Sequence, residues 1–272
     1  MNRKDVPGLA GSVCLGALAG FALLTMVVIG RDGAPLFMDS GLHTWSDSHR
    51  PTVALAVARG LTATGTGVWP YALVVLAGVI AGRTARQRVI AAAMGLGCLL
   101  AGQGLRYGVL HLVARPRPPE QDWATHASGW SFPSGHTSTS AITALLLIIA
   151  VLLRSPRGRR TTAVVIGCWA VAVGLTRVYL GVHWFTDVLG GWLYALAWVG
   201  LVVGVGTRWW ERREERGRRV PVPVQGAGRQ GPGAVGRTSG GPGSGVVRAG
   251  TGHAGRPRRF VGGLRLGGER VL

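Results

Sequence analysis

Charged residues are scarce in this chain of 272 residues. They make up 15% of the sequence, whereas hydrophobic residues make up 47%. A soluble globular domain carries about 25% charged residues. Several apolar runs here approach the ~20 residues that a helix needs to cross the hydrocarbon of a bilayer. The deficit therefore argues against a soluble protein and predicts several membrane-spanning helices.

Acidic residues are the scarcest charged type, with 11 Asp and Glu against 30 Lys and Arg and a formal net charge of +19. In a soluble protein this balance would indicate nucleic-acid binding. Here the basic residues lie in short loops between apolar runs and in the C-terminal tail, a distribution that favours anionic lipid headgroups and control of topology. We expect no nucleic-acid partner. The loops on the side of the membrane opposite the basic segments have no carboxylate cluster suited to Mg²⁺. We therefore expect no metal and no cofactor.

Cysteine is also rare, with three residues in the chain. Cys14, Cys98 and Cys168 are far apart, each lies within an apolar run, and none shows a CxxC spacing. The pattern predicts small buried hydrophobic side chains rather than a disulfide or a metal site.

The apolar runs predict an all-α bundle of six membrane helices. The predicted spans cover residues 11–30, 68–82, 89–113, 134–153, 161–177 and 183–206. Residues 53–61 form a shorter apolar stretch, predicted to be a surface or entry helix. Basic residues gather at the N-terminus, at 83–88, at 154–160 and after 207. The positive-inside rule places these segments in the cytoplasm, so both termini are expected there. The loops 31–51, 114–133 and 178–182 are then expected on the extracytoplasmic side.

The last part of the chain differs in composition from the rest. From residue 208 onward it is rich in Gly, Arg and Pro and has little periodic apolar pattern. This composition predicts a membrane domain over residues 1–207 and a disordered cytoplasmic tail over 208–272. The sequence does not define a role for the tail or an oligomeric state.

A first polar cluster lies at the predicted outer face, between the last two spans. His183 and Asp187 are four residues apart, so on a helix they share one face. The carboxylate can fix the imidazole tautomer and leave the other nitrogen free to attack. Arg177 precedes them across a loop that contains Gly181, and it can bind an oxyanion through two N–H groups. A plain surface hydrogen bond between His183 and Asp187 is the alternative reading.

Two further polar clusters support the interpretation of this region as a functional site. Pro133-Ser134-Gly135-His136 opens an apolar helix, whose first N–H groups bind phosphate well. Ser134 adds a hydroxyl, Gly135 permits close approach of backbone to an anion, and His136 can supply a proton to a leaving oxygen. Arg117 adds a second cation beside prolines. Polar groups converging at one depth from separate helix ends predict a functional site.

These motifs resemble the type-2 phosphatidic acid phosphatase family, which includes vanadium haloperoxidases and glucose-6-phosphatase. The family pattern is Lys-x6-Arg-Pro, then Pro-Ser-Gly-His, then Ser-Arg-x5-His-x3-Asp. This chain matches at Arg117-Pro118, at Pro133 to His136, and at Thr176-Arg177 through His183 to Asp187, with Thr in place of Ser. The family Lys falls on Leu110. Two nearby side chains are candidate substitutes, Arg106 and His111.

The resemblance implies a membrane lipid phosphatase that uses a phosphohistidine and no metal. Arg117, Ser134, Gly135 and Arg177 would bind phosphate, His183 would attack with Asp187 orienting it, and His136 would protonate the leaving group. The implied substrates are lipid phosphates such as undecaprenyl diphosphate, phosphatidic acid and phosphatidylglycerol phosphate. Two alternatives stay open. One is a lipid phosphotransferase with the same site, and the other, motivated by Leu110, is a non-catalytic membrane protein with a degenerate site.

Overall fold

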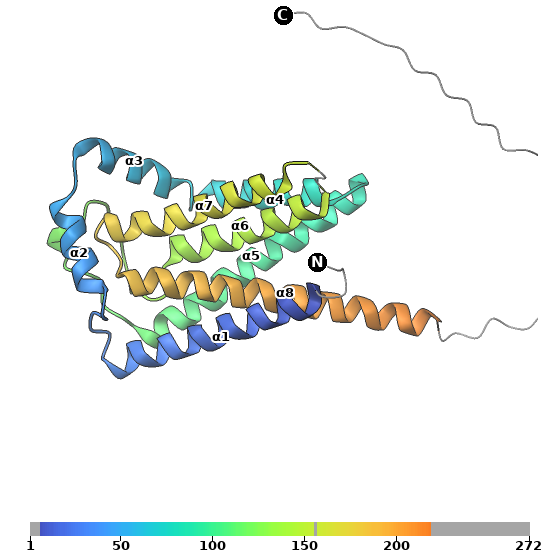
Figure 1. Cartoon of the computed structure of the whole chain (residues 1–272), viewed down its shortest axis with the longest axis horizontal. Coiled ribbons are helices and arrows are strands. Elements are labelled where there is room, and N and C mark those ends of the chain that lie inside the picture. The colour runs from blue at the N-terminus through green and yellow to red at the C-terminus, as the bar shows by residue number, and fades with distance from the viewer. Residues whose placement is uncertain (1–5, 155–156, 219–272) are drawn as a thin grey trace, which may run out of the picture. The chain divides into compact units, whose positions relative to one another are not determined.

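The computed structural model describes residues 6–154 and 157–218, and every regular element within these ranges is a helix (Figure 1). This confirms the predicted all-α class. The elements are α1 (Val6–Gly30), α2 (Asp39–Ser48), α3 (Thr52–Ala63), α4 (Val68–Ala81), α5 (Ala85–Val113), the 3₁₀ helix η1 (Glu120–Asp122), α6 (Gly135–Arg154), α7 (Arg159–Tyr179) and α8 (Phe185–Arg218).

Within residues 6–154 and 157–218, five helices are long and apolar enough to cross a membrane, and the chain is therefore a multi-pass membrane protein. The qualifying stretches are Gly11–Gly30, Ala85–Val113, Gly135–Arg154, Arg159–Tyr179 and Phe185–Trp209. The predicted span 68–82 corresponds to α4, whose 14 residues extend about 21 Å at ~1.5 Å per residue, short of the ~30 Å hydrocarbon core. Together with α3, from which it is bent by 53°, α4 forms a sixth apolar stretch of sufficient length.

The bend between α3 and α4 depends on glycine. Gly67 has a φ of +64°, and a Cβ on Gly65 would lie 2.4 Å from Cγ1 of Val173 on α7. Positive φ and so close an approach both exclude ordinary side chains. The bend therefore sits directly against α7. The predicted surface helix 53–61 is the first half of this broken pair.

Helix α6 lies at the centre of the bundle and contacts α4, α5, α7 and α8. In its spanning stretch 61% of the residues are buried, against 11% in α1. One core cluster joins Leu99 of α5, Ile142 of α6 and Tyr194 of α8. Because lipid tails are as apolar as these side chains, close packing and interhelical hydrogen bonds hold such helices together. The Tyr194 hydroxyl provides one, donating to the Gly102 carbonyl at 2.6 Å.

The helix order brings four termini together at one end of the bundle. The C-termini of α5 and α7 and the N-termini of α6 and α8 lie at the left in Figure 1, and α2 lies at the same end. The arginine-bearing connections at 83–88 and 157–160 lie at the opposite end. All the polar clusters found in the sequence therefore share one end.

Two expectations are corrected. Residues 208–218, predicted to begin the disordered tail, continue α8 to Arg218, because Arg and Glu there favour helix. The rest of the predicted tail, residues 219–272, lies outside the described residues. Cys168 is exposed on the bundle surface and Cys14 and Cys98 are half-buried, although all three are free as expected. An apolar side chain in a membrane helix can face lipid as readily as a protein core.

Candidate active site

The connection from α7 to α8 holds His183 and Asp187 against each other. His183 Nδ1 lies 3.4 Å from Asp187 Oδ2, and their side chains are 3% and 0% exposed. His183 precedes α8, so the expectation that both residues share a helix face is corrected. Asp187 instead reaches back over the first turn, where Oδ2 accepts the Trp184 N–H at 2.9 Å. This carboxylate at a helix N-terminus brings the two residues together.

Arg117 fixes the tautomer of His183. Its Nη1 lies 3.0 Å from His183 Nε2. A guanidinium has only donors, so Nε2 must be the acceptor and the imidazole proton must sit on Nδ1, facing Asp187. Burial lowers the pKa of His183 to about 4, against the opposing effect of its hydrogen bond to Asp187. The imidazole is therefore neutral at neutral pH, with its lone pair on Nε2, as a nucleophile requires.

Backbone carbonyl groups hold the Arg117 guanidinium in place. Nη1 donates to the Val182 carbonyl at 2.7 Å, and Nε donates to the Gly129 carbonyl at 2.9 Å. Nη2 donates to the carbonyls of Ser128 and Trp130. Burial lowers the pKa of Arg117, yet a guanidinium remains protonated. The loop before α6 thus presents a fixed cation to His183.

The start of α6 is joined directly to the start of α8. The Ser134 N–H donates to the Asp187 carbonyl at 3.1 Å, and the buried Ser134 hydroxyl accepts from Thr137 at 3.0 Å. Gly191 on α8 makes this approach possible, since a Cβ there would lie 2.9 Å from Cβ of Thr137. The first N–H groups of α6, which a helix leaves without intrahelical partners, therefore lie beside the first turn of α8.

The second imidazole belongs to the same cluster. His136 Nε2 lies 3.5 Å from Thr66 Oγ1, in the connection between α3 and α4. Arg177, His183, Arg117 and Arg106 all interact electrostatically with His136. The two histidines singled out by the sequence thus occupy the same end of the bundle and the same charged environment.

Two more arginines approach from α5 and α7. Arg177 is 3% exposed; its Nη1 donates to Thr62 Oγ1 at 3.2 Å, and its buried Nε has no hydrogen-bond partner. Arg106 is 8% exposed and donates from Nη1 to the Pro133 carbonyl at 2.9 Å. Its guanidinium lies 3.3 Å from the position that a Cβ on Gly135 would take. Within the described residues, none of Arg106, Arg117 and Arg177 forms an ion pair with a carboxylate.

The structure distinguishes the two candidate substitutes for the family Lys. Arg106 reaches the start of α6, whereas His111 is exposed and its ring stacks on Tyr107 with centroids 6.2 Å apart. Leu110 itself is buried. The 3.6-residue period puts 106 and 110 on one face of α5. Arg106 lies one turn before Leu110, and its longer side chain reaches the start of α6 from there.

Sequence reasoning gave no role to Arg115 or Asp39. Both side chains are fully buried and form an ion pair at 2.8 Å. Arg115 also pairs with Asp187 at 2.6 Å. The sequence signal was the first arginine of Arg115-Pro116-Arg117-Pro118, but its partner Asp39 lies 76 positions earlier, at the start of α2. Within the described ranges, no group of three or more His, Cys, Asp or Glu side chains has a geometry suited to a metal ion.

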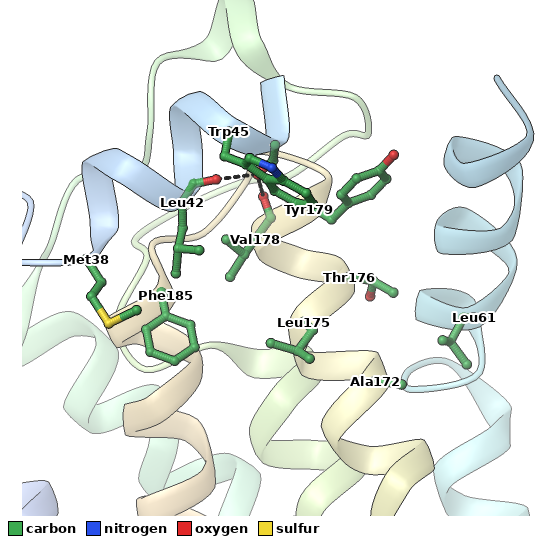
Figure 2. A pocket seen from close by; sticks show the side chains of 11 residues that line it. Met38, Leu42, Trp45, Leu61, Ala172, Leu175, Thr176, Val178, Tyr179 and Phe185 are labelled. Carbon is green, nitrogen blue, oxygen red and sulfur yellow. Dashed lines mark hydrogen bonds between the residues drawn. The ribbon is translucent and has the colours of Figure 1, made fainter. Parts of the chain in front are cut away.

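An apolar cavity of about 580 Å³ lies near this end of the bundle (Figure 2). It lies between α2 and α7, with Leu61 at the end of α3 and Phe185 at the start of α8. Two of its lining residues, Leu61 and Thr176, directly precede Thr62 and Arg177 in the chain. Apolar side chains dominate its lining.

The fold and the cluster define a class: a helical membrane protein with several arginines and a buried, neutral histidine at one end of the bundle. Residues 90–211 match the family described as the PAP2 superfamily. This match confirms the resemblance seen in the motifs.

Curated relatives share this part of the sequence. Phosphatidylglycerophosphatase B of Bacillus subtilis (strain 168) is 38% identical over 97 residues, which are 34% of this chain and 46% of that protein. Phosphatidylglycerophosphatase B of Escherichia coli (strain K12) is 38% identical over 81 residues, 30% of this chain and 31% of that protein. Undecaprenyl-diphosphatase of Sulfolobus acidocaldarius is 38% identical over 76 residues, 27% of this chain and 32% of that protein. The chain thus spans less than half the length of each of these relatives.

A solved structure shows the same fold. The PAP2-type phosphatidylglycerolphosphate phosphatase from Bacillus subtilis superposes with a TM-score of 0.61 at 24% identity. The superposition covers 72% of this chain and 96% of that one. The arrangement of helices in this chain is therefore similar to the one in that structure.

Proposed function

We propose that this protein is an integral membrane phosphatase that hydrolyses a lipid phosphate or a polyprenyl diphosphate through a phosphohistidine. The observation that carries the proposal is the group of three buried or half-buried arginines, Arg106, Arg117 and Arg177, around the pair of histidines, His136 and the neutral His183. Burying a cation without a counter-ion is costly. A phosphoryl group supplies that counter-ion, and the unpartnered Nε of Arg177 supplies a free donor for it.

The substrate phosphate is bound by charge and by backbone. Arg117 and Arg177 donate to its non-bridging oxygens, and Arg106 adds a third positive charge in place of the family Lys. Ser134 and Gly135 place the first turn of α6 beside the phosphate, where free N–H groups and the helix dipole favour an anion. Positioning and charge stabilisation of this kind account for most of the catalysis in phosphoryl transfer.

The chemistry proceeds in two displacements. His183 Nε2 attacks the terminal phosphorus in line, and its P–O bond to the lipid alcohol, or in a diphosphate to the lipid phosphate, breaks. His136 donates a proton to the departing oxygen. The proton on His183 Nδ1 faces Asp187, whose carboxylate stabilises the positive charge that develops on the imidazole. Water then attacks the phosphohistidine, His136 takes the water proton, and the P–N bond breaks to release phosphate and restore His183.

The lipid nature of the substrate is supported by the surroundings of the site. The helix ends that carry it belong to membrane-spanning helices, and the cavity of Figure 2 has a lining suited to hydrocarbon. The relatives named above act on phosphatidylglycerol phosphate and undecaprenyl diphosphate by their names. Phosphatidic acid is the third candidate.

The topology follows from the charge distribution. The arginine-bearing connections at 83–88 and 157–160 lie at the end of the bundle opposite the site, and the positive-inside rule assigns that end to the cytoplasm. We therefore propose an extracytoplasmic site, both termini in the cytoplasm, and a membrane domain that runs through residue 207 into the rest of α8.

A phosphate-release assay in detergent tests the proposed function. Purified protein is incubated with each of the three candidate lipid classes, alongside His183→Ala and a matched control, His126→Ala, at an exposed histidine. We expect release by wild type and the control and none by His183→Ala. Residual wild-type rates in His183→Ala would refute the nucleophile assignment. Radiolabelled phosphate trapped in an acceptor lipid would instead identify a phosphotransferase.

A further inference from the structure

Arg115 is a fully buried cation with every donor occupied. Nη1 donates to Asp187 Oδ1 at 2.6 Å and to Thr186 Oγ1 at 2.7 Å. Nη2 donates to Asp39 Oδ2 at 2.8 Å and to the Ala34 carbonyl at 3.1 Å, and Nε donates to the Gly33 carbonyl at 3.1 Å. All five N–H groups of the guanidinium thus have acceptors, and two of those acceptors are carboxylates.

Asp39 is the other half of this arrangement. It opens α2, and its Oδ2 accepts the Leu36 N–H at 2.8 Å. It also accepts the Thr186 N–H at Oδ1, at 2.9 Å, and the Thr186 hydroxyl at Oδ2, at 2.7 Å. The short helix α2 is therefore attached to the first turn of α8, beside Asp187. Its carboxylate is one of the two anions that pair with the single Arg115 cation in the group Asp39–Arg115–Asp187.

Stability alone is a weak reason for this group. Taking three charges out of water costs several kcal/mol per ion, and apolar residues of similar volume often serve stability as well. Its geometric effect on Asp187 is specific. Arg115 takes Oδ1, which leaves Oδ2 to the Trp184 N–H, the Ser131 hydroxyl and His183 Nδ1. Without Arg115 the carboxylate loses the contact that fixes Oδ1, and only the donors to Oδ2 still orient it toward the imidazole.

We propose that Arg115 and Asp39 are positioning residues that hold the Asp187 carboxylate with Oδ2 facing His183 Nδ1. The catalytic part of this inference rests on the proposed function, since His183 is the nucleophile there. Asp39 keeps the Arg115 fork aligned, and Thr186 bridges the two by accepting from Arg115 and donating to Asp39. Through these contacts α2 becomes a structural support of the nucleophile.

Kinetics and a spectroscopic signal together test the positioning role. The variants are Asp39→Asn, Arg115→Gln, Arg115→Lys and Thr186→Val, and the matched control is Asp47→Asn, on α2 but 52% exposed. We expect Asp39→Asn and Arg115→Gln to lower kcat on the order of 10–100-fold, as loss of an outer partner does around metal-bound histidines, while KM changes less. Arg115→Lys keeps the charge but loses the fork and recovers part of the rate.

The spectroscopic signal is independent of turnover. In isotope-labelled full-length protein in detergent, the Nδ1 proton of His183, assigned with His183→Gln, reports the hydrogen bond to Asp187. We expect this resonance to move upfield in Asp39→Asn and Arg115→Gln and to stay in place in Asp47→Asn. If Arg115→Gln does not fold, the Nδ1 resonance in Asp39→Asn and Thr186→Val tests the positioning role instead.

The outcomes separate the two proposals. An unchanged Nδ1 resonance and an unchanged kcat in folded Asp39→Asn and Thr186→Val would overturn the positioning role, whatever the wild-type activity. A wild-type protein that releases no phosphate from any lipid, yet shows the shifts in the Nδ1 resonance, would overturn the proposed function and support the positioning geometry.

Discussion

Arg117 Nη1 lies 3.0 Å from His183 Nε2, the atom that attacks phosphorus in the proposed mechanism. The guanidinium therefore occupies the space into which a phosphoryl group must come. When substrate binds, the donor that faces the imidazole lone pair has to turn toward the phosphate oxygens. Before substrate binds, the contact with Arg117 keeps His183 Nε2 unprotonated. After substrate binds, the same guanidinium stabilises the negative charge of the phosphoryl oxygens.

This relationship predicts a large effect of substitutions at Arg117. Arg117→Ala should lower kcat/KM by on the order of 100-fold or more, as loss of an oxyanion-binding donor does. Arg117→Lys should recover only part of the rate, since a lysine cannot span the phosphate and the loop carbonyls. Steady-state kinetics on the best lipid substrate measures both. Near-wild-type rates in folded Arg117→Ala would exclude a role in phosphate binding.

The second prediction concerns acid pH. Because burial lowers the pKa of His183 to about 4, its neutral form persists well below neutrality. The acid limb of kcat/KM should therefore lie near pH 4 rather than near the ordinary value of 6.5. A profile over about pH 3 to pH 7 locates this limb. An acid limb close to the ordinary histidine value would contradict the buried, neutral nucleophile.

The same shift in pKa has a consequence for stability. The folded pKa of about 4 lies below the ordinary value of 6.5, so the unfolded chain takes up this proton first on acidification. Above pH 6.5 this group leaves the free energy of unfolding unchanged. As the pH drops from 6.5 toward 4, the free energy of unfolding decreases by up to about 1.4 kcal/mol per pH unit because of this group. Thermal unfolding of wild type and His183→Gln over this range isolates the contribution.

The third prediction concerns the position of the missing family Lys. Arg106→Gln should lower activity, because Arg106 brings the third cation to the start of α6. Leu110→Lys should leave activity equal or higher. In the double variant, Leu110→Lys should restore part of what Arg106→Gln loses, since 106 and 110 share a face of α5. Independent, additive effects in this double-mutant cycle would show that the two positions do not serve one site.

The fourth prediction concerns metal. Arginines and a helix N-terminus neutralise the phosphate in the proposed mechanism, so EDTA should leave the rate of phosphate release unchanged. The assay needs only the wild-type protein with and without chelator. A strong loss of activity that added Mg²⁺ reverses would contradict the mechanism.

The fifth prediction tests the contact between α6 and α8. Gly191→Ala places a methyl group 2.9 Å from Cβ of Thr137, and overpacking of this kind costs about 1–3 kcal/mol. We expect a lower thermal unfolding temperature and a lower kcat, because Ser134 moves away from Asp187. The control is Gly204→Ala on the same helix, where a Cβ meets no atom within 4 Å. Equal melting temperatures for the two variants would show that the contact is not tight.

The sequence by itself determined the all-α membrane class and the residues that carry the motifs. Apolar runs long enough to cross a bilayer have few alternatives to helix, because backbone polar groups in lipid must be satisfied internally. Charged side chains in such runs are also costly to place in lipid, so the few that occur indicate a functional site. His136, Arg177 and His183 could be singled out because each interrupts an apolar pattern at a helix end.

The tertiary structure decided how these side chains meet. Arg106 rather than His111 reaches the cluster because α5 turns one face to α6, and periodicity alone does not say which face that is. Asp39 and Arg115 meet across 76 positions of sequence, where no local pattern links them. Hydropathy determines which segments enter the membrane, whereas helix rotation and close packing determine which polar groups become neighbours.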